Sequence, residues 1–223
     1  MEILSAYVRE NAKWNKDNTN NSNNLLNGNI NGVLDKEKAP TDIQAIMTVI
    51  GRRNWLELER NQIRVINLRM TKLSNIDLRR AQMERTNLRG SNLERANLAE
   101  TNLVNAFIGE ANLAGANLVK ADLTGANLVG ANLENVNFRG ANLRGANLMR
   151  ARLKGALLEG AKLDGANLME VDLQNGNLCG VSLVNVNLTN TKLHKVKYDY
   201  DTIFPDWLNQ ELKEELKMSF SNG

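Results

Sequence analysis

One large apolar residue stands at every fifth position from Ile63 to Tyr198, 28 times without a change of phase. We call this residue the centre of a five-residue unit. A small or β-branched residue, most often Ala, lies two positions before the centre, and Asn or Asp usually lies one position before it. The typical unit reads A-N-L-x-x, as at Ala111-Asn112-Leu113. This spacing restricts the fold more than any other property of the chain.

A five-residue period fits neither a helix nor a flat strand. An α-helix turns about 100° per residue, so residues five apart differ in direction by about 140° and form no continuous apolar face. In a flat strand the side chains alternate between two faces, so an odd spacing sends every second centre to the opposite side. The chain must therefore bend by a fixed amount in each unit, so that every centre returns to the same interior.

Glycine and asparagine mark the position of the bend, because these residues tolerate positive φ. Of the 12 glycines in the repeat, ten lie two residues after a centre: Gly90, Gly115, Gly125, Gly130, Gly140, Gly145, Gly155, Gly160, Gly165 and Gly180. Asparagine takes the same position at Asn75, Asn105, Asn135, Asn175, Asn185 and Asn190. A type II turn whose first residue is the centre requires positive φ at its third residue, which is the position two after the centre. Each unit is thus predicted to be a three-residue strand followed by a corner. The small residue and the centre point inward, and the residue between them points outward.

Charged residues indicate how many units make one coil. Within 61–200, residues 20 apart carry opposite charges nine times and like charges once, at Arg69/Arg89. Spacings of 15 and 25 each give five opposite pairs against three like pairs. The nine are Arg64/Glu84, Arg80/Glu100, Glu100/Lys120, Glu134/Lys154, Arg139/Glu159, Arg144/Asp164, Arg150/Glu170, Arg152/Asp172 and Asp172/Lys192. Because cross-strand neighbours favour opposite charge, this predicts four units per coil, a square cross-section and about seven coils.

These residues resemble the pentapeptide-repeat family over roughly residues 60–203, since its units read A-[DN]-L-x-x. The resemblance implies a right-handed quadrilateral β-helix. The segment 41–53 also resembles a leader that precedes the repeats in many cyanobacterial members. Longer members carry additional residues upstream of the stretch that matches 3–11. The chain is therefore expected to be a shortened version of such members. Departures from the unit include Phe107, Arg152, Leu157, Lys162 and Lys192 at the Asn or Asp position, and Gly176 at the Ala position.

The predicted fold class is an all-β solenoid with α-helical N- and C-terminal segments. Residues 1–15 form a short amphipathic helix, 16–40 an Asn-rich flexible linker, and 41–60 a capping helix with a lead-in to the repeat. The β-helix is predicted over 61–204, and the C-terminal helical segment over 205–223. A solenoid needs its terminal coils covered, because open strand edges promote aggregation. Whether the N-terminal helix caps the rod or binds a partner stays open.

The C-terminal segment carries apolar residues on one side of a helix expected over 207–218. They are Trp207, Leu208, Leu212 and Leu216. Such a cap surface can also join two chains end to end, so we consider a symmetric homodimer through this end as an expectation.

Little in the sequence indicates chemistry. One Cys (Cys179) and one His (His194), both expected at the surface, supply no conventional zinc cluster and no Cys/His catalytic pair. No catalytic, cofactor-binding or metal-binding residues are predicted, and neither a cofactor nor a small-molecule substrate is expected. We find no transmembrane segment and no secretory signal, which favours a cytoplasmic protein.

A basic group of residues marks the first coils. It comprises Arg64, Arg69, Lys72, Arg79, Arg80, Arg85, Arg89 and Arg95, with Asp77, Glu84 and Glu94 among them. A solvated surface explains it, and the functional alternative is a docking patch for an acidic partner, a nucleic acid or an anionic membrane.

The leading functional hypothesis is a non-enzymatic interaction module or scaffold that binds an unknown protein partner. The first alternative is a DNA-gyrase or topoisomerase-binding protein, since some members of the resembled family mimic duplex DNA. A DNA mimic should be acidic, whereas 61–200 contains 18 Lys and Arg against 12 Asp and Glu. The second alternative is a binder of nucleic acid or another anionic surface through the basic first coils.

Overall fold

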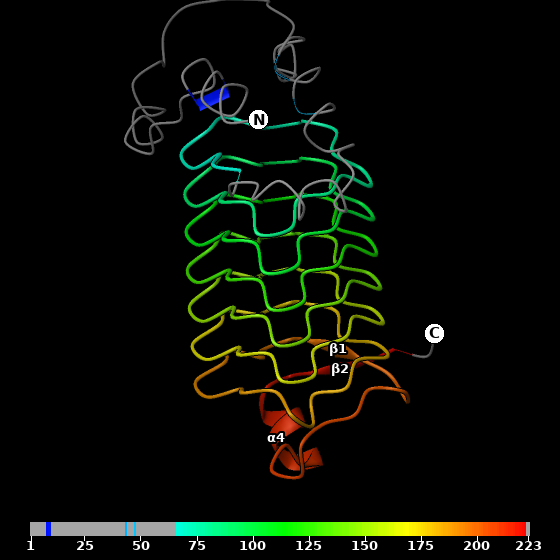
Figure 1. Cartoon of the computed structure of the whole chain (residues 1–223). Helices are drawn as coiled ribbons and strands as arrows, with labels where there is room; N and C mark the ends of the chain where they lie inside the picture. Colours follow the sequence, from blue (N-terminus) through cyan, green and yellow to red (C-terminus); the bar gives the residue numbers. More distant parts are fainter. Residues whose placement is uncertain (1–7, 10–42, 44–46, 48–65, 222–223) are drawn as a thin grey trace, which may run out of the picture.

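Short strands and tight corners alternate along the whole repeat, as the five-residue unit predicts. The computed structural model describes residues 8–9, 43, 47 and 66–221. In Figure 1 the repeat winds as a stack of similar four-cornered coils from residue 66 toward the C-terminal end.

Parallel β-bridges join residues 20 apart, which confirms the register inferred from the charges. Four faces result, and each is defined by its first residue and every twentieth residue after it: Asn67, Lys72, Asp77 and Gln82. Bridges connect seven levels of the first face without a break, from Asn67 to Asn187. On the fourth face no bridge among the described residues joins Lys162 to Ser182, so the regular register weakens near the end of the rod.

Every backbone N–H group of a typical unit has a defined acceptor, as the unit around Leu113 shows. The N–H of Asn112 donates to Ser91 O of the coil before, and that of Leu113 donates to Asn132 O of the coil after. The N–H of Gly115 also donates to the next coil, and the N–H of Ala116 donates to Leu113 O to close the corner.

The remaining N–H group, one residue after the centre, is satisfied by the outward Asn side chain. The N–H of Ala114 donates to Asn112 Oδ1 at 3.3 Å. The Nδ2 of Asn112 donates to Asn92 Oδ1 at 3.2 Å, and the Nδ2 of Asn132 donates to Asn112 Oδ1 at 2.8 Å, so the amides form a ladder along the face. Asn and Asp recur at this position because both can accept the corner N–H, and Asn can also donate to the next coil.

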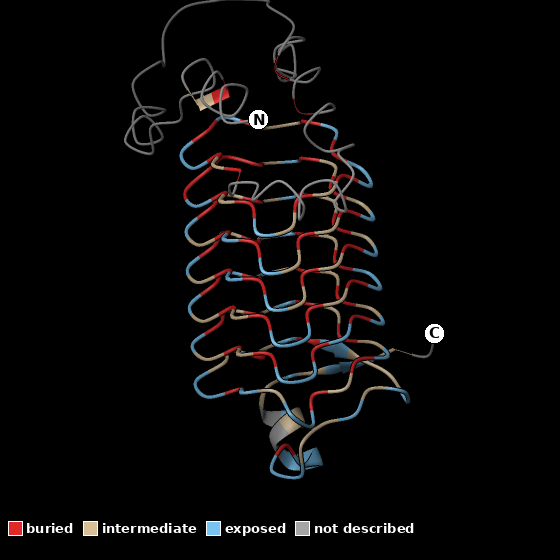
Figure 2. Cartoon of the chain, viewed as in Figure 1, coloured by how far each residue is buried: buried red, intermediate tan, exposed pale blue. Residues whose placement is uncertain are grey.

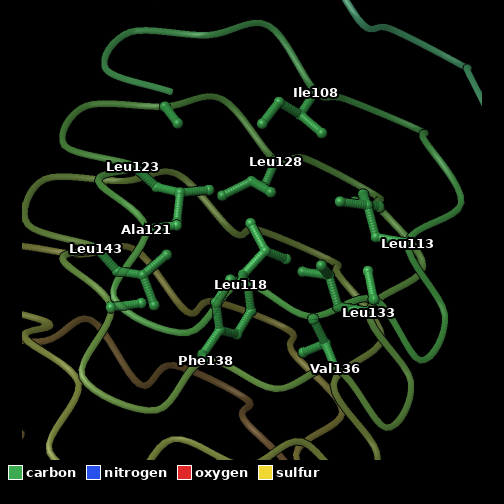
Figure 3. Close-up of a cluster of buried hydrophobic side chains, with 14 of the residues drawn as sticks. Ile108, Leu113, Leu118, Ala121, Leu123, Leu128, Leu133, Val136, Phe138 and Leu143 are labelled. Carbon is green, nitrogen blue, oxygen red and sulfur yellow. The ribbon is translucent and has the colours of Figure 1, made fainter. Parts of the chain in front are cut away.

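The interior is a stack of centres with small residues beside them. Figure 3 shows Leu113, Leu118, Leu123 and Leu128 entering the interior from different sides of a coil, and all four are fully buried. Buried and exposed segments alternate around every coil (Figure 2). Each buried Leu contributes about 1.5–3 kcal/mol, so stability is distributed along the rod.

Hydroxyl groups at the inward small position bond to backbone carbonyls in the first coils. Thr71 Oγ1 donates to Leu68 O at 2.6 Å, and Ser91 Oγ donates to Leu88 O at 2.7 Å. Thr86 Oγ1 is buried without a hydrogen-bond partner.

The corner residue two after the centre has positive φ from Met70 to Lys195, with Asn185 as the exception. All ten glycines predicted for this position adopt it, at φ of 63–71°. Asn185 departs from the prediction, and it lies on the coil next to the irregular end of the fourth face. Long side chains such as those of Glu110 and Lys120 also occupy the position, because the cross-coil hydrogen bonds hold the backbone there.

The predicted N-terminal helix, linker and capping helix lie mostly outside the described residues. The four described residues before the repeat, Val8, Arg9, Ile43 and Met47, are helical. Val8, Ile43 and Met47 are buried and belong to the core cluster. The boundaries 1–15, 16–40 and 41–60 stay predictions.

The C-terminal end departs from the five-residue register. Strand β1 (Lys197–Tyr198) pairs in parallel with β2 (Ser219–Phe220), and Lys197 lies opposite Ser219. Between them lies helix α4 (Gln210–Glu215), at the end of the rod in Figure 1. Ile203 pairs with Ser182 at a spacing of 21 residues.

The helix predicted over 207–218 is therefore wrong in extent. Its first hydrogen bond runs from Lys213 N–H to Asn209 O, which makes Asn209 the N-cap. A Schellman motif ends it, because Met218 N–H donates to Lys213 O, Lys217 N–H donates to Glu214 O, and Lys217 has φ of 52°. The chain then returns to the rod as β2 instead of continuing as helix to 223.

Leu128→Ala should lower the free energy of unfolding by about 2–5 kcal/mol, since Leu128 is a fully buried centre and its truncation leaves a cavity. Urea denaturation measures the change. Val129→Ala, next to it at a partly exposed corner, is the matched control and should cost much less. An unchanged midpoint for Leu128→Ala would contradict the inward assignment.

Phe107→Asn should raise the free energy of unfolding by about 0.5–1.5 kcal/mol. The new side-chain amide can accept a hydrogen bond from the corner N–H of Gly109, and it can extend the amide ladder between Asn87 and Asn127 of the same face. Phe107 is 49% exposed, so little apolar burial is lost. Phe107→Ala removes the ring without supplying the amide and should give no such gain. Equal midpoints for both variants would show that the ladder adds no stability.

Candidate interaction surfaces

The predicted basic residues of the first coils do not gather on one face. Arg69 and Arg89 share the corner between the first and second faces, whereas Arg79 and Arg80 lie at the corner between the third and fourth. The corner between the second and third faces carries Arg95. Arg85 lies at the corner between the fourth and first faces, Lys72 lies on the second face, and Arg64 is outside the described residues.

Acidic neighbours pair with five of these arginines. The pairs are Arg79–Asp77 at 2.8 Å, Arg80–Glu100 at 2.9 Å, Arg85–Glu84 at 3.8 Å, Arg89–Glu110 at 2.6 Å and Arg95–Glu94 at 3.9 Å. The positive charge is thus distributed around the rod and largely compensated. An interaction role for these residues stays a prediction.

Eight of the nine charge pairs inferred at a spacing of 20 lie wholly within the described residues, and four of these eight form direct ion pairs. They are Arg80–Glu100, Arg139–Glu159, Arg144–Asp164 and Arg150–Glu170, at 2.8–2.9 Å. Arg152 instead reaches Glu134 at 3.4 Å, a spacing of 18. A long side chain can bend toward either of two neighbouring carboxylates, so the sequence spacing identifies the coil that is contacted but not always the partner.

Hydrogen bonds within two of these pairs lower the pKa of the carboxylates. The guanidinium of Arg80 lowers the pKa of Glu100 through a hydrogen bond and through its charge. The hydrogen bond from Arg150 likewise lowers the pKa of Glu170. A lowered pKa in the folded state stabilises the fold above the unfolded-state pKa, and this contribution is lost as the pH falls through the folded-state pKa.

The predicted end-to-end surface is only partly exposed. Leu208 is 2% exposed and belongs to the core, and Leu216 packs partly buried against that core. Trp207 remains 56% exposed. Leu212 lies in α4, but its side chain is outside what the structure describes. Leu208 thus covers the end of the rod and is not available to a second chain.

An aromatic cluster that the sequence analysis missed lies at this end: Tyr198, Tyr200, Phe204 and Phe220. Tyr198 makes edge-to-face contacts with Phe204 at 5.3 Å and with Phe220 at 5.5 Å between ring centroids. Tyr200 contacts Phe220 at 4.5 Å. Lys213 Nζ lies 4.1 Å from the centroid of Phe204 and 5.1 Å from that of Tyr198.

One signal in the sequence could have indicated this cluster. Aromatic residues are rare in the repeat, where Phe107 and Phe138 alone lie between 66 and 197, but the next 24 residues contain five: Tyr198, Tyr200, Phe204, Trp207 and Phe220. The return of β2 to β1 brings Phe220 beside Tyr198. The unit pattern cannot predict that pairing because it lies outside the repeat.

Among the described residues, the single Cys and the single His lie at different corners of the rod. Cys179 is partly exposed, and burial together with the nearby Asp199 carboxylate raises the pKa of its thiol. His194 is partly exposed at another corner. Within the described residues, no group of three or more His, Cys, Asp or Glu side chains is arranged to hold a metal ion. No helix in the described part of the chain has the length and apolar character that crossing a bilayer requires.

Comparison with known proteins identifies the repeat. The family model for pentapeptide repeats (8 copies) matches residues 66–95, 91–128, 108–145, 126–165, 146–183 and 166–197, more than half of the chain. A comparison with proteins of curated function found no match.

Among solved structures, HetL of the cyanobacterium Nostoc sp. strain PCC 7120, involved in heterocyst differentiation regulation, is 29% identical. The match covers 65% of this chain and 74% of HetL, with a TM-score of 0.33. Another pentapeptide repeat protein of Nostoc PCC 7120 is 32% identical over 54% of this chain and 84% of that chain, with a TM-score of 0.29. QnrB1, a plasmid-mediated fluoroquinolone resistance protein, is 17% identical over 66% of this chain and 84% of its own, with a TM-score of 0.34. These likenesses support no inference about partner or role.

Arg80→Gln should raise the pKa of Glu100 toward its ordinary value, because the substitution removes the hydrogen bond and the positive charge that lower it. NMR titration of the side-chain carboxyl carbon measures the pKa. The separate Arg150–Glu170 pair is an internal control and should keep its lowered pKa. An unchanged pKa for Glu100 would show that the pair does not persist in solution.

Proposed function

We propose that this chain, which belongs to the pentapeptide-repeat family, is a non-enzymatic interaction module whose rod presents a protein-binding surface at its C-terminal end. The fold of this family is the right-handed quadrilateral β-helix, in accord with the register of 20 residues. The observation that carries the proposal is the position of the exposed large apolar side chains. Four of the seven among the described residues, Tyr200, Ile203, Trp207 and Phe220, lie in the last coil and the cap, whereas Met70, Phe107 and Val184 lie on the rod.

Most of the rod presents a different surface. Its outward positions are bound to one another through Asn ladders such as Asn92–Asn112–Asn132 and through ion pairs such as Arg139–Glu159. A partner that binds there must replace hydrogen bonds that are already made. At the C-terminal end a partner instead covers apolar area, which is favourable by about 25 cal/mol per Å².

The other two hypotheses find less support in the geometry. Five of the basic residues of the first coils are already paired with carboxylates, which weakens attraction to a nucleic acid or an anionic membrane. For a topoisomerase-binding role, the excess of basic residues within 61–200 is opposite to the charge of duplex DNA. The exposed C-terminal surface favours a protein partner.

Affinity capture of the tagged chain from its native host tests the proposal. Tyr200→Ser combined with Trp207→Ser should reduce the recovery of a specific partner about tenfold or more, because exposed aromatic residues are frequent binding hot spots. Tyr200 is 86% and Trp207 56% exposed, so neither substitution should unfold the rod.

Phe107→Ser is the matched control, since it removes an exposed ring from the first face, far from the C-terminal coil. This variant should retain the partner. Equal recovery by the wild type and the double variant, or no specific partner at all, would contradict binding through the C-terminal end.

A further inference from the structure

The C-terminal end combines exposed aromatic rings with carboxylates that are not used by the fold. Tyr200 and Phe220 form an exposed edge-to-face pair with centroids 4.5 Å apart. Tyr198 connects this pair to Phe204. The four rings thus form one continuous cluster that extends from the cap to the surface.

This cluster already contacts one cation. Lys213 projects from α4 and places its ammonium group over the rings of Phe204 and Tyr198. A cation over an aromatic face is attracted by the negative potential of the ring. Tyr200 and Phe220, at the exposed end of the cluster, have no cation–π partner within the described residues, so these rings remain accessible to a cation from outside.

The surrounding charge has the opposite sign to that of the rod. Residues 195–221, which include β1, α4 and β2, carry six acidic and four basic residues, whereas 61–200 has a basic excess. Asp201 follows Tyr200 directly, Asp206 precedes Trp207 directly, and Glu211 lies in α4. All three are exposed, and none has an ion-pair partner in the part of the chain that the structure describes. Most acidic residues of the first coils, in contrast, are paired with arginine.

We infer that this end binds a basic segment of a partner protein, with Arg or Lys side chains against Tyr200 and Phe220 and apolar side chains against Trp207 and Ile203. The inference rests on the proposed function and adds the chemistry of the partner. Carboxylates attract the basic segment, and the rings then contact its cationic and apolar groups.

Charge also distinguishes a basic protein segment from two other possible occupants of this surface, a second copy of the chain and a nucleic acid. A symmetric homodimer that buries this end in both chains would bring two acidic surfaces together, and repulsion of like charges opposes that arrangement. A nucleic acid would meet the same repulsion from its phosphates. A basic protein segment is therefore the occupant that fits.

A fluorescein-labelled peptide of alternating Arg and Leu residues is the probe, and fluorescence anisotropy measures its binding to the full chain. The wild type should bind this peptide, and should not bind the same peptide with Glu in place of Arg. Binding should weaken as salt is added. Since the whole chain has a formal charge of +3, overall charge alone would oppose the basic peptide.

Two variants localise the binding. Tyr200→Ala should weaken it about fivefold through loss of the cation–π contact. Asp201→Asn combined with Asp206→Asn and Glu211→Gln should weaken it about tenfold, as expected when three exposed charge interactions are removed.

A matched triple variant, Asp122→Asn with Asp172→Asn and Glu94→Gln, changes the net charge equally but at the rod. It should bind as the wild type does, since Asn is the usual residue at positions 122 and 172 of the ladder. Circular dichroism confirms that each variant is folded.

Three results would overturn the inference: no binding of the basic peptide, equal affinity for the wild type and both C-terminal variants, or self-association in sedimentation that Tyr200→Ala abolishes. The last would assign the surface to a second copy of the chain. If a captured partner is lost with Tyr200→Ser and Trp207→Ser but kept by the acidic triple variant, the proposed function stands and the basic partner is wrong.

Discussion

The structure depends on the requirement that every backbone N–H group of a five-residue unit finds an acceptor. Four donate to backbone carbonyls, three of them to neighbouring coils and one across the corner, as around Leu113. The fifth donates to the outward Asn side chain, as Ala114 does to Asn112. Because three of these bonds reach other coils, no unit is complete alone. Each coil is held by the next, and the fixed register brings every centre into one interior.

This register also accounts for the surface of the rod. Outward positions at a given corner or face lie beside the residues 20 before and 20 after, so Asn side chains form ladders and charged side chains form ion pairs such as Arg144–Asp164. The repeat thereby presents a polar surface whose groups bind one another. The C-terminal end follows different rules: Asn209 starts a short helix, a Schellman motif ends it, and β2 returns to β1. Exposed aromatic residues and free carboxylates occur together there, which is why the proposed binding surface lies outside the repeat.

The distribution of charge changes the interpretation of both ends. The basic residues of the first coils share a short stretch of sequence, but the corners direct them around the circumference and place carboxylates beside five of them. Leu208 was expected at an interface, but it is buried as part of the cap. In both cases the residue type, basic or apolar, does not by itself decide whether the side chain is available to a partner. The function of these residues depends on neighbours that are distant in the sequence.

The sequence by itself determined the five-residue unit, the inward centres, the positive φ of corners such as Gly145, and four units per coil. These follow from a local pattern repeated so often that only one geometry satisfies it. Only the tertiary structure decided which ion pairs form, where α4 begins and ends, and that Phe220 packs against Tyr198 and Tyr200. The physical reason is periodicity: within the repeat each residue has an equivalent neighbour one coil away. The cap has no repeat, so its contacts are set by how one particular segment folds back onto the last coil.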